Sequence, residues 1–228
     1  MTTTETFPTA QGHARLHVTN APGRPWAVVV LGHGAGGGVE AKDLVALATG
    51  LPSHGISVVR VEQPWRVAGR RIAPAPAVLD AAWLPAVEEA VRAVPGVPLV
   101  VGGRSAGARV ACRCAEATGA VGVVALAFPL HPPGRPDRSR VGELAISAPL
   151  LVVQGERDSF GAPEEFSGVE VVAIPAGDHG FAVPRRGPLT SGEVDSLLVA
   201  AVVNWMSPWV RGRTRRESAT RVSALPPA

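Results

Sequence analysis

The stretch GGRSAG, residues 102–107, decides how the rest of the chain is interpreted. It contains Gly-x-Ser-x-Gly with Ser105 in the middle, between an apolar run over 98–103 and a segment of helical periodicity that starts at Ala106. A serine at such a sharp strand-to-helix turn is held in a strained backbone conformation, and small neighbours let the strand and the helix approach each other. A plain Gly/Ser-rich turn is the alternative, but the flanking elements favour a raised, nucleophilic Ser105.

Around this stretch, short β-branched runs alternate with segments of helical periodicity. This alternation predicts an α/β fold in which helices cover both faces of a mainly parallel sheet. The predicted buried strands are 26–32, 56–61, 98–103, 121–127, 150–154 and 169–174, and 15–19 is a candidate edge strand.

Four segments have the apolar spacing of amphipathic helices. They are 44–51, 77–94, 106–117 and a segment that begins at Thr190. In the second of these, Pro85 is expected to cause a kink or a restart. In the last, Thr190 and Glu193 have the spacing of a capping box, and Pro208 is expected to end the helix.

The 228 residues suffice for a single domain, which is predicted over residues 13–209. Residues 1–12 are expected to be a flexible N-terminus, and residues 210–228 a disordered, Arg-rich tail. From residue 211 on there are five arginines and one glutamate, so the net charge of +3 comes from the tail. Specific binding of nucleic acid is therefore not expected, and at most the tail contacts anions non-specifically.

Composition excludes other classes of protein. With 46% hydrophobic and 18% charged residues, the chain is not intrinsically disordered. Its longest apolar stretch, 121–128, is far shorter than the roughly 20 residues that cross a bilayer. The first residues contain no basic leader and no apolar block, so the expected location is the cytoplasm. Cys112 and Cys114 point in directions roughly 160° apart on a helix, so they cannot pair, and neither has metal-ligand spacing.

A serine hydroxyl needs a base, and the base needs a carboxylate to orient it. Asp158 follows the predicted strand 150–154, and His179 follows the predicted strand 169–174. Both are thus expected at the C-terminal edge of the sheet, which also presents Ser105. The sequence therefore predicts a catalytic triad of Ser105, Asp158 and His179.

Two other carboxylates compete with Asp158 for the role of the acid. Asp178 is adjacent to His179 and is expected to shape the turn, whereas Glu156 lies closer to the end of the preceding strand. His179 itself has an alternative role as a turn histidine. Asp158 remains the favoured acid.

The Gly-rich segment LGHGAGGG, residues 31–38, directly follows the first buried strand. Glycines let the backbone approach a substrate and turn N–H groups toward one point. We expect the N–H groups of Ala35 and Ala106 to form an oxyanion hole. The segment lacks the glycine spacing of a dinucleotide loop and the Gly-Lys-Ser/Thr ending of a phosphate loop.

Residues 13–206 resemble the α/β-hydrolase superfamily, and within it the small dienelactone-hydrolase-like group that includes the Tex30/KANSL-type hydrolase-like proteins. The resemblance rests on the phrases LGHGAGG, GGRSAGARVA, FPLHPPGRP, VQGERDSFG and GDHGF. It implies a core of about eight strands, the triad named above and hydrolase chemistry, but no particular substrate. Dienelactone hydrolases proper have a cysteine where this chain has Ser105.

Large members of that superfamily insert a lid after the sixth strand, where this chain has only the Pro-rich segment 128–142. An open and shallow site is therefore expected. Phe128, Leu130 and His131 are predicted to line it, with Trp65 as a wall. His131 has the alternative role of holding its own loop in place.

The predicted function is that of a serine hydrolase, of esterase or thioesterase type, which cleaves small carboxylic esters without a cofactor or a metal. The alternative is a binding or scaffold protein that keeps the fold without turnover. Arg66, Arg70 and Arg71 either form a basic rim for an acidic substrate or belong to a solvated loop face, and the solvated face is preferred.

Overall fold

The computed structural model describes residues 2–223, with side chains for residues 2–210. Its strands are β1 (Thr2–Thr9), β2 (Gly12–Thr19), β3 (Ala27–Gly32), β4 (Ile56–Glu62), β5 (Leu99–Arg104), β6 (Gly122–Leu126), β7 (Leu150–Gly155) and β8 (Glu170–Ile174). They form an eight-stranded sheet in the order β1-β2-β4-β3-β5-β6-β7-β8. β1 and β2 pair antiparallel, as do β2 and β4, and all other neighbours are parallel.

The central strands are apolar because helices cover both of their faces. Every residue of β3, β6 and β7 is buried. The six strands predicted from apolar runs are confirmed. The segment 15–19 is a strand, as part of β2, but its expected place at the edge of the sheet is wrong, because β1 pairs with its outer side. β8 is only partly buried because it lies at the edge of the sheet, which differs from the prediction of a fully covered strand.

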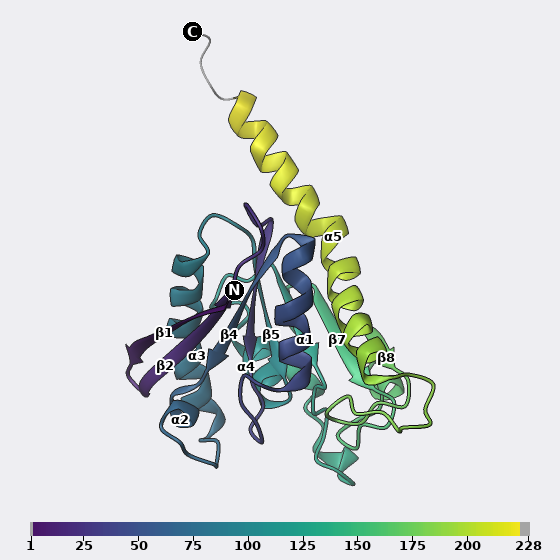
Figure 1. Ribbon diagram of the computed structural model, residues 1–228. Coiled ribbons are helices and arrows are strands. Elements are labelled where there is room, and N and C mark those ends of the chain that lie inside the picture. Colours follow the sequence, from purple (N-terminus) through teal and green to yellow (C-terminus); the bar gives the residue numbers. More distant parts are fainter. Residues whose placement is uncertain (1, 224–228) are drawn as a thin grey trace.

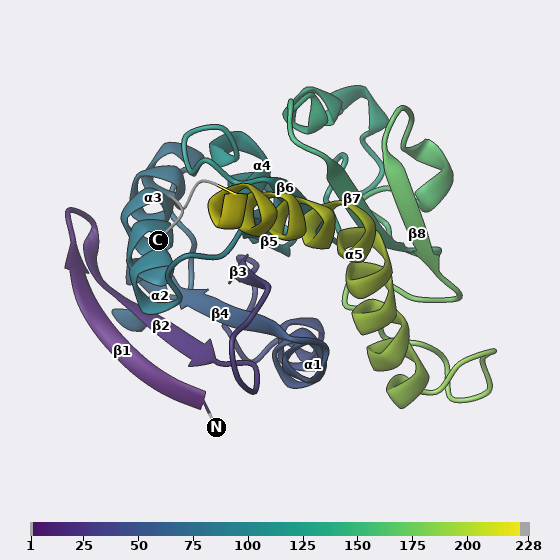
Figure 2. The same ribbon diagram turned by 90° about the horizontal axis from the view of Figure 1, so that it is seen from above.

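The helices are α1 (Lys42–Gly50), α2 (Pro64–Val67), α3 (Pro76–Ala93), α4 (Ala106–Cys114) and α5 (Ser191–Ser223). Short 3₁₀ turns are Leu51–His54, Pro136–Arg138, Val141–Leu144 and Pro163–Glu165. α3 and α4 pack on one face of the sheet, and α1 and α5 pack on the other (Figure 2). The chain is therefore a three-layer structure with a core on each side of the sheet.

Two prolines lie inside helices. α3 continues through Pro85 as one helix, so there is no restart. α5 begins with the predicted capping box of Thr190 and Glu193, but it does not end at Pro208. Trp205 and Trp209 contact each other edge to face on either side of this proline, and their packing opposes the roughly 3 kcal/mol that an interior proline costs.

Two predictions about the ends of the chain are wrong. The segment expected to be flexible forms β1, which pairs with β2 over its whole length. Only Phe7 in β1 is buried, so the sequence has no apolar alternation that would predict a strand there. The segment expected to be disordered continues α5 to Ser223, past the end of the sheet (Figure 1). Residues 224–228 lie outside the described part of the chain. No helix within residues 2–223 combines the length and the apolar character needed to cross a membrane.

Candidate active site

Ser105 occupies the sharp turn between β5 and α4. Its backbone has φ 52° and ψ −116°, a conformation that costs free energy for a residue with a Cβ. Glycines on either side of the serine let the turn pack closely against the end of β3. A Cβ on Gly107 would lie 2.3 Å from the Gly32 oxygen, and a Cβ on Gly103 would lie 2.4 Å from the same oxygen. The Ser105 N–H donates to the Leu126 oxygen at 3.0 Å, which ties the turn to β6.

A chain of hydrogen bonds connects Ser105 to two side chains from distant loops. His179 Nε2 lies 2.9 Å from Ser105 Oγ, and His179 Nδ1 lies 2.8 Å from Asp158 Oδ2. A carboxylate accepts the proton of Nδ1, which leaves Nε2 as the acceptor for the serine hydroxyl. The structure thus brings together the three residues predicted as a triad.

The Asp158 carboxylate is fully buried and held on both oxygens. Gln154 Nε2 donates to Oδ2 at 2.8 Å, and the Phe160 N–H donates to Oδ1 at 2.9 Å. Neither rival carboxylate takes this place. Glu156 accepts the Ala176 N–H at 2.8 Å.

The other rival, Asp178, shapes the turn around His179, as expected. Its Oδ1 accepts the N–H groups of Gly180 and Ala182 at 2.8 and 2.9 Å. Asp178 thus supports the loop that carries the imidazole, while Asp158 contacts the ring itself.

Two groups that sequence reasoning missed also hold His179. The Phe160 ring lies on the imidazole, with ring centroids 4.3 Å apart. Arg104 donates from Nη2 to the His179 carbonyl oxygen at 2.7 Å and from Nε to Asp43 Oδ2 at 2.9 Å. Phe160 and Arg104 each stand within two residues of a predicted triad member, and this proximity is the only signal that the sequence offered.

Asp43, near the start of α1, is buried beside Arg104. Burial raises the pKa of this carboxyl, and the attraction of the Arg104 guanidinium opposes that rise. The pair links α1 to the residue immediately before Ser105. Because Arg104 also donates to the His179 carbonyl oxygen, it connects the loop that carries His179 to α1.

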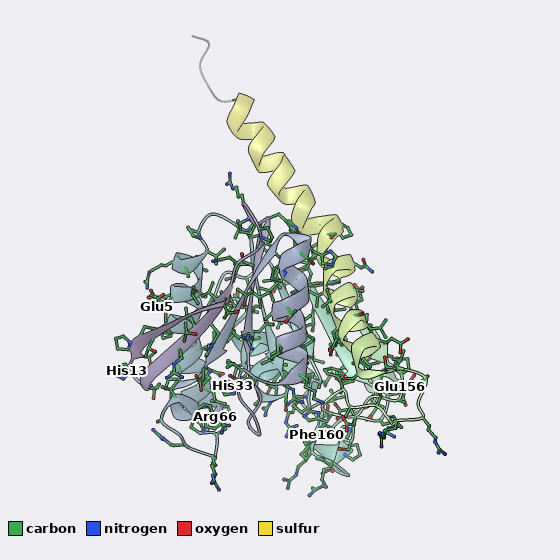
Figure 3. The ribbon with its side chains drawn as sticks, in the orientation of Figure 1. Glu5, His13, His33, Arg66, Glu156 and Phe160 are labelled. Carbon is green, nitrogen blue, oxygen red and sulfur yellow. The ribbon has the colours of Figure 1, made fainter. Side chains whose placement is uncertain are left out.

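The loop after β3 faces the same turn. His33 donates from Nδ1 to the Gly34 oxygen at 2.9 Å, and its Nε2 accepts the Gln63 N–H at 3.1 Å. Burial lowers the pKa of His33, which favours the neutral ring that this pattern requires. In Figure 3, His33, Arg66 and Phe160 lie toward the same end of the molecule.

Two backbone N–H groups, one in the loop after β3 and one at the start of α4, are available to a ligand. Among the described residues, the N–H groups of Ala35 and Ala106 have no hydrogen-bond acceptor. Both residues line one small cavity. A developing oxyanion beside Ser105 would meet donors of this kind.

The predicted pocket-lining residues are buried more deeply than expected. Phe128 has no exposed surface and packs edge to face on Phe166. The prediction that its ring lines the substrate pocket is therefore wrong. Leu130 is only 4% exposed and belongs to the same core. His131 bonds through Nε2 to Glu165 at 2.9 Å, which agrees with its alternative role in holding the loop.

Trp65, at 3% exposure, lines the cavity beside Ala35 and Ala106. Arg66 is half-buried, and Arg70 and Arg71 are exposed on the loop that follows α2. The segment between β6 and β7 holds two 3₁₀ turns and no α-helix, and His179 keeps 23% of its side chain exposed. The candidate site is therefore open to solvent.

Neither cysteine belongs to this site. Cys112 and Cys114 are buried and unpaired, and burial raises the pKa of Cys112 to about 12 and that of Cys114 to about 11. Both thiols are therefore protonated at neutral pH. In the part of the chain with described side chains, no group of three His, Cys, Asp or Glu residues is arranged to hold a metal ion.

Comparisons with known proteins add the following. A family model described as an alpha/beta hydrolase domain matches residues 25–207. A search among curated proteins found no match. Among solved structures, XC6422 from Xanthomonas campestris, described as an α/β serine hydrolase without lid, is 21% identical, with a TM-score of 0.71 over 90% of this chain and 94% of that chain.

Two further structures are similar at lower identity. Dienelactone hydrolase from Anabaena variabilis is 15% identical, with a TM-score of 0.69 over 91% of this chain and 97% of that chain. Est1E from Butyrivibrio proteoclasticus with ferulic acid bound is 13% identical, with a TM-score of 0.67 over 89% of this chain and 99% of that chain. These structures share the fold of the chain.

Proposed function

The chain belongs to the alpha/beta hydrolase family, and from that membership we propose that it is a serine hydrolase that cleaves small carboxylic esters or thioesters. The observation that carries the proposal is the hydrogen-bond chain from Ser105 through His179 to the buried Asp158. The narrower kinship with the Tex30/KANSL-type proteins stays a prediction.

In the first half of the reaction, Ser105 Oγ attacks the carbonyl carbon of the ester while His179 Nε2 takes its proton. The carbonyl oxygen becomes an oxyanion, which accepts hydrogen bonds from the N–H groups of Ala35 and Ala106. The imidazolium then gives its proton to the leaving alcohol or thiol, and the acyl group remains on Ser105. Asp158 stabilises the imidazolium through its bond to Nδ1.

In the second half, water replaces the alcohol. His179 Nε2 takes a proton from the water, whose oxygen attacks the acyl carbon of the acyl-enzyme. Return of this proton to Ser105 Oγ as the acyl–oxygen bond breaks releases the carboxylic acid. No cofactor enters this sequence of steps.

The open site favours small substrates that arrive directly from solvent. Ser105 and His179 are both partly exposed, and the segment between β6 and β7 has no α-helix to cover them. We place the reaction in the cytoplasm, as the sequence suggested, and the unpaired Cys112 and Cys114 are compatible with that compartment.

The proposal is tested with 4-nitrophenyl esters of graded acyl length, using the wild-type protein and Ser105→Ala. We expect turnover of short acyl esters that falls by roughly 10⁴–10⁶-fold in Ser105→Ala. If the folded wild-type protein hydrolysed none of the esters, the proposal would fail and the scaffold alternative would replace it. Circular dichroism of both proteins checks the fold.

A further inference from the structure

A small cavity adjoins the N–H groups of Ala35 and Ala106, on the face of the sheet that α3 and α4 cover. We call it the side cavity. Its inner wall comes mainly from Gln63, Trp65, Leu79, Trp83 and Val110. The space between these side chains is about that of one water molecule. The cavity thus has room for one polar group of that size.

Three of the residues that line this cavity each carry a buried polar atom without a hydrogen-bond partner among the described residues: Gln63 Oε1, Trp65 Nε1 and Trp83 Nε1. The three residues are 5%, 3% and 0% exposed. Buried polar atoms without partners cost free energy, so proteins rarely keep them, and three in residues that line one cavity require an explanation. Only two other such atoms, in Arg60 and Gln154, occur in the described part of the chain, and neither residue lines this cavity.

The Gln63 amide is fixed in its orientation. Its Nε2 donates to the Leu79 oxygen at 3.2 Å, which identifies Oε1 as the free acceptor. The backbone N–H of the same residue donates to His33 Nε2, so Gln63 is also tied to the loop that carries Ala35. The unpartnered acceptor therefore belongs to a residue that is bonded to the loop of Ala35.

The chemistry of the wall selects among polar groups. Two indole N–H donors and one amide oxygen complement a hydroxyl, which accepts two hydrogen bonds and donates one. A carboxylate could not donate to Gln63 Oε1, and an ammonium could not accept from Trp65 or Trp83. The lining also contains no charged residue to balance an ion.

We propose that the side cavity is a binding subsite for a hydroxyl group on the acyl part of the substrate, so that the protein prefers esters of short hydroxy acids. The inference rests on the proposed hydrolase function, because it places the ester carbonyl at Ala35 and Ala106. When such a substrate binds, its hydroxyl supplies the hydrogen-bond partners that the three atoms lack within the protein.

The first test compares pairs of methyl esters in which a hydroxyl replaces a terminal methyl group. The pairs are glycolate with propanoate, 3-hydroxypropanoate with butanoate, and 4-hydroxybutanoate with pentanoate. Acid release is followed by pH-stat titration. We expect kcat/KM to favour the hydroxy ester by about 10–100-fold at one chain length, because an apolar group leaves the wall unpaired. Hydrolysis with a ratio near one for all pairs would overturn the subsite and leave the hydrolase proposal intact.

Variants connect the preference to the wall. Trp83→Phe keeps an aromatic ring but removes a donor, and Gln63→Met removes the acceptor, so each is expected to lower the hydroxy-to-alkyl ratio about tenfold. Trp26→Phe is the matched control, because Trp26 donates to the His54 oxygen away from the cavity. Its ratio is expected to be unchanged. An unchanged ratio in folded Trp83→Phe and Gln63→Met would contradict the assignment.

A binding measurement separates this inference from the proposed function. Ser105→Ala is titrated with the intact methyl esters by calorimetry, which needs no turnover. Tighter binding of the hydroxy ester, lost on combination with Trp83→Phe, is expected even if the wild-type protein hydrolyses nothing. Equal binding of both members of each pair, or binding of neither, would overturn the subsite.

Discussion

The two sides of Ser105 differ in how their polar atoms are satisfied. On the side of His179, both oxygens of Asp158 and both ring nitrogens of the imidazole have partners in the protein. On the side of the Gly-rich loop, the N–H groups of Ala35 and Ala106 have no acceptor in the described part of the chain. Beyond them lie the three unpartnered atoms of the side cavity.

This difference separates the two tasks of a catalytic site. Side chains that move protons need fixed positions, and complete hydrogen bonding provides them. Groups that bind a substrate must keep donors and acceptors free until the substrate arrives. We therefore expect variants on the partnered side to lower the rate for every substrate, and variants of the side cavity to alter the choice among substrates.

The largest effect is expected when the base is removed. His179→Ala leaves Ser105 without an acceptor for its proton, so kcat/KM should fall by roughly 10⁴–10⁶-fold. Ser105→Ala combined with His179→Ala should be no slower than either single variant, since the two residues act as a unit. Losses that multiplied in the double variant would show that the residues act separately.

A smaller loss is expected from Asp158→Asn. The amide can present an N–H to the imidazole, which favours the tautomer that cannot accept the serine proton, so turnover should fall by about 10³–10⁴-fold. Glu156→Gln is the matched control, because Glu156 binds the Ala176 N–H and does not contact His179. The same ester assay compares both variants. A larger loss in Glu156→Gln would reassign the acid.

A change at Arg104 tests whether its hydrogen bond to the His179 carbonyl oxygen positions the imidazole. Arg104→Met removes the donor to the His179 oxygen and should lower kcat by about 10–100-fold through misplacement of the ring. It also leaves the buried Asp43 carboxylate unpaired, at a cost of about 3–5 kcal/mol in unfolding free energy. Kinetics and urea unfolding measure the two effects.

Arg104→Lys separates the effect on the rate from the effect on the unfolding free energy. A lysine keeps the charge that pairs with Asp43 but lacks the guanidinium fork whose Nε and Nη2 reach the two acceptors separately, so we expect it to restore more of the stability than of the rate. Full recovery of both, or a loss of stability in Arg104→Met without any loss of rate, would argue against a positioning role.

The smallest effect is expected from a change in a cluster of ion pairs away from the site, where only the unfolding free energy should respond. Glu143 accepts hydrogen bonds from Arg109 and Arg113 on the outer face of α4. Burial alone would raise the pKa of this carboxyl, but the two guanidinium groups hold it below its ordinary value of 4.5. A lowered folded-state pKa gives stability that is present above about pH 4.5 and is lost as the pH falls further.

Glu143→Gln should therefore lower the unfolding free energy by about 1 kcal/mol at pH 7, with a difference that shrinks below pH 4.5. Ester hydrolysis should not change. Unfolding in urea at several pH values measures the first expectation. A pH-independent difference between the two proteins, or a large loss of rate, would contradict this assignment.

The features that the sequence predicted best are the buried strands, which packing makes apolar, and the triad, which chain order places at one edge of the sheet. Strands buried on both faces are apolar throughout, so β3 to β7 were recognisable, and the order of Ser105, Asp158 and His179 along the chain placed all three at one edge of the sheet. β1 was missed because its exposed residues carry no apolar period. α5 continues through Pro208 although local rules predict an end there, and the Trp205–Trp209 contact across the proline is a tertiary feature that those rules do not contain.

The residues that support the site were harder to predict from the sequence for a similar reason. Arg104 and Asp43 act through contacts between segments far apart in the chain, and no spacing rule connects them. Phe128 was misplaced because a position after a strand does not reveal whether a ring points into the core or into the site.

The most direct measurement of the central claim is covalent labelling of the folded protein with a fluorophosphonate probe, read by intact mass and peptide mapping. The hydrogen-bond chain to Ser105 predicts one adduct per molecule, located on Ser105, with labelling abolished in Ser105→Ala and strongly slowed in His179→Ala. A folded wild-type protein that gained no adduct, or that was labelled at another residue, would contradict the account.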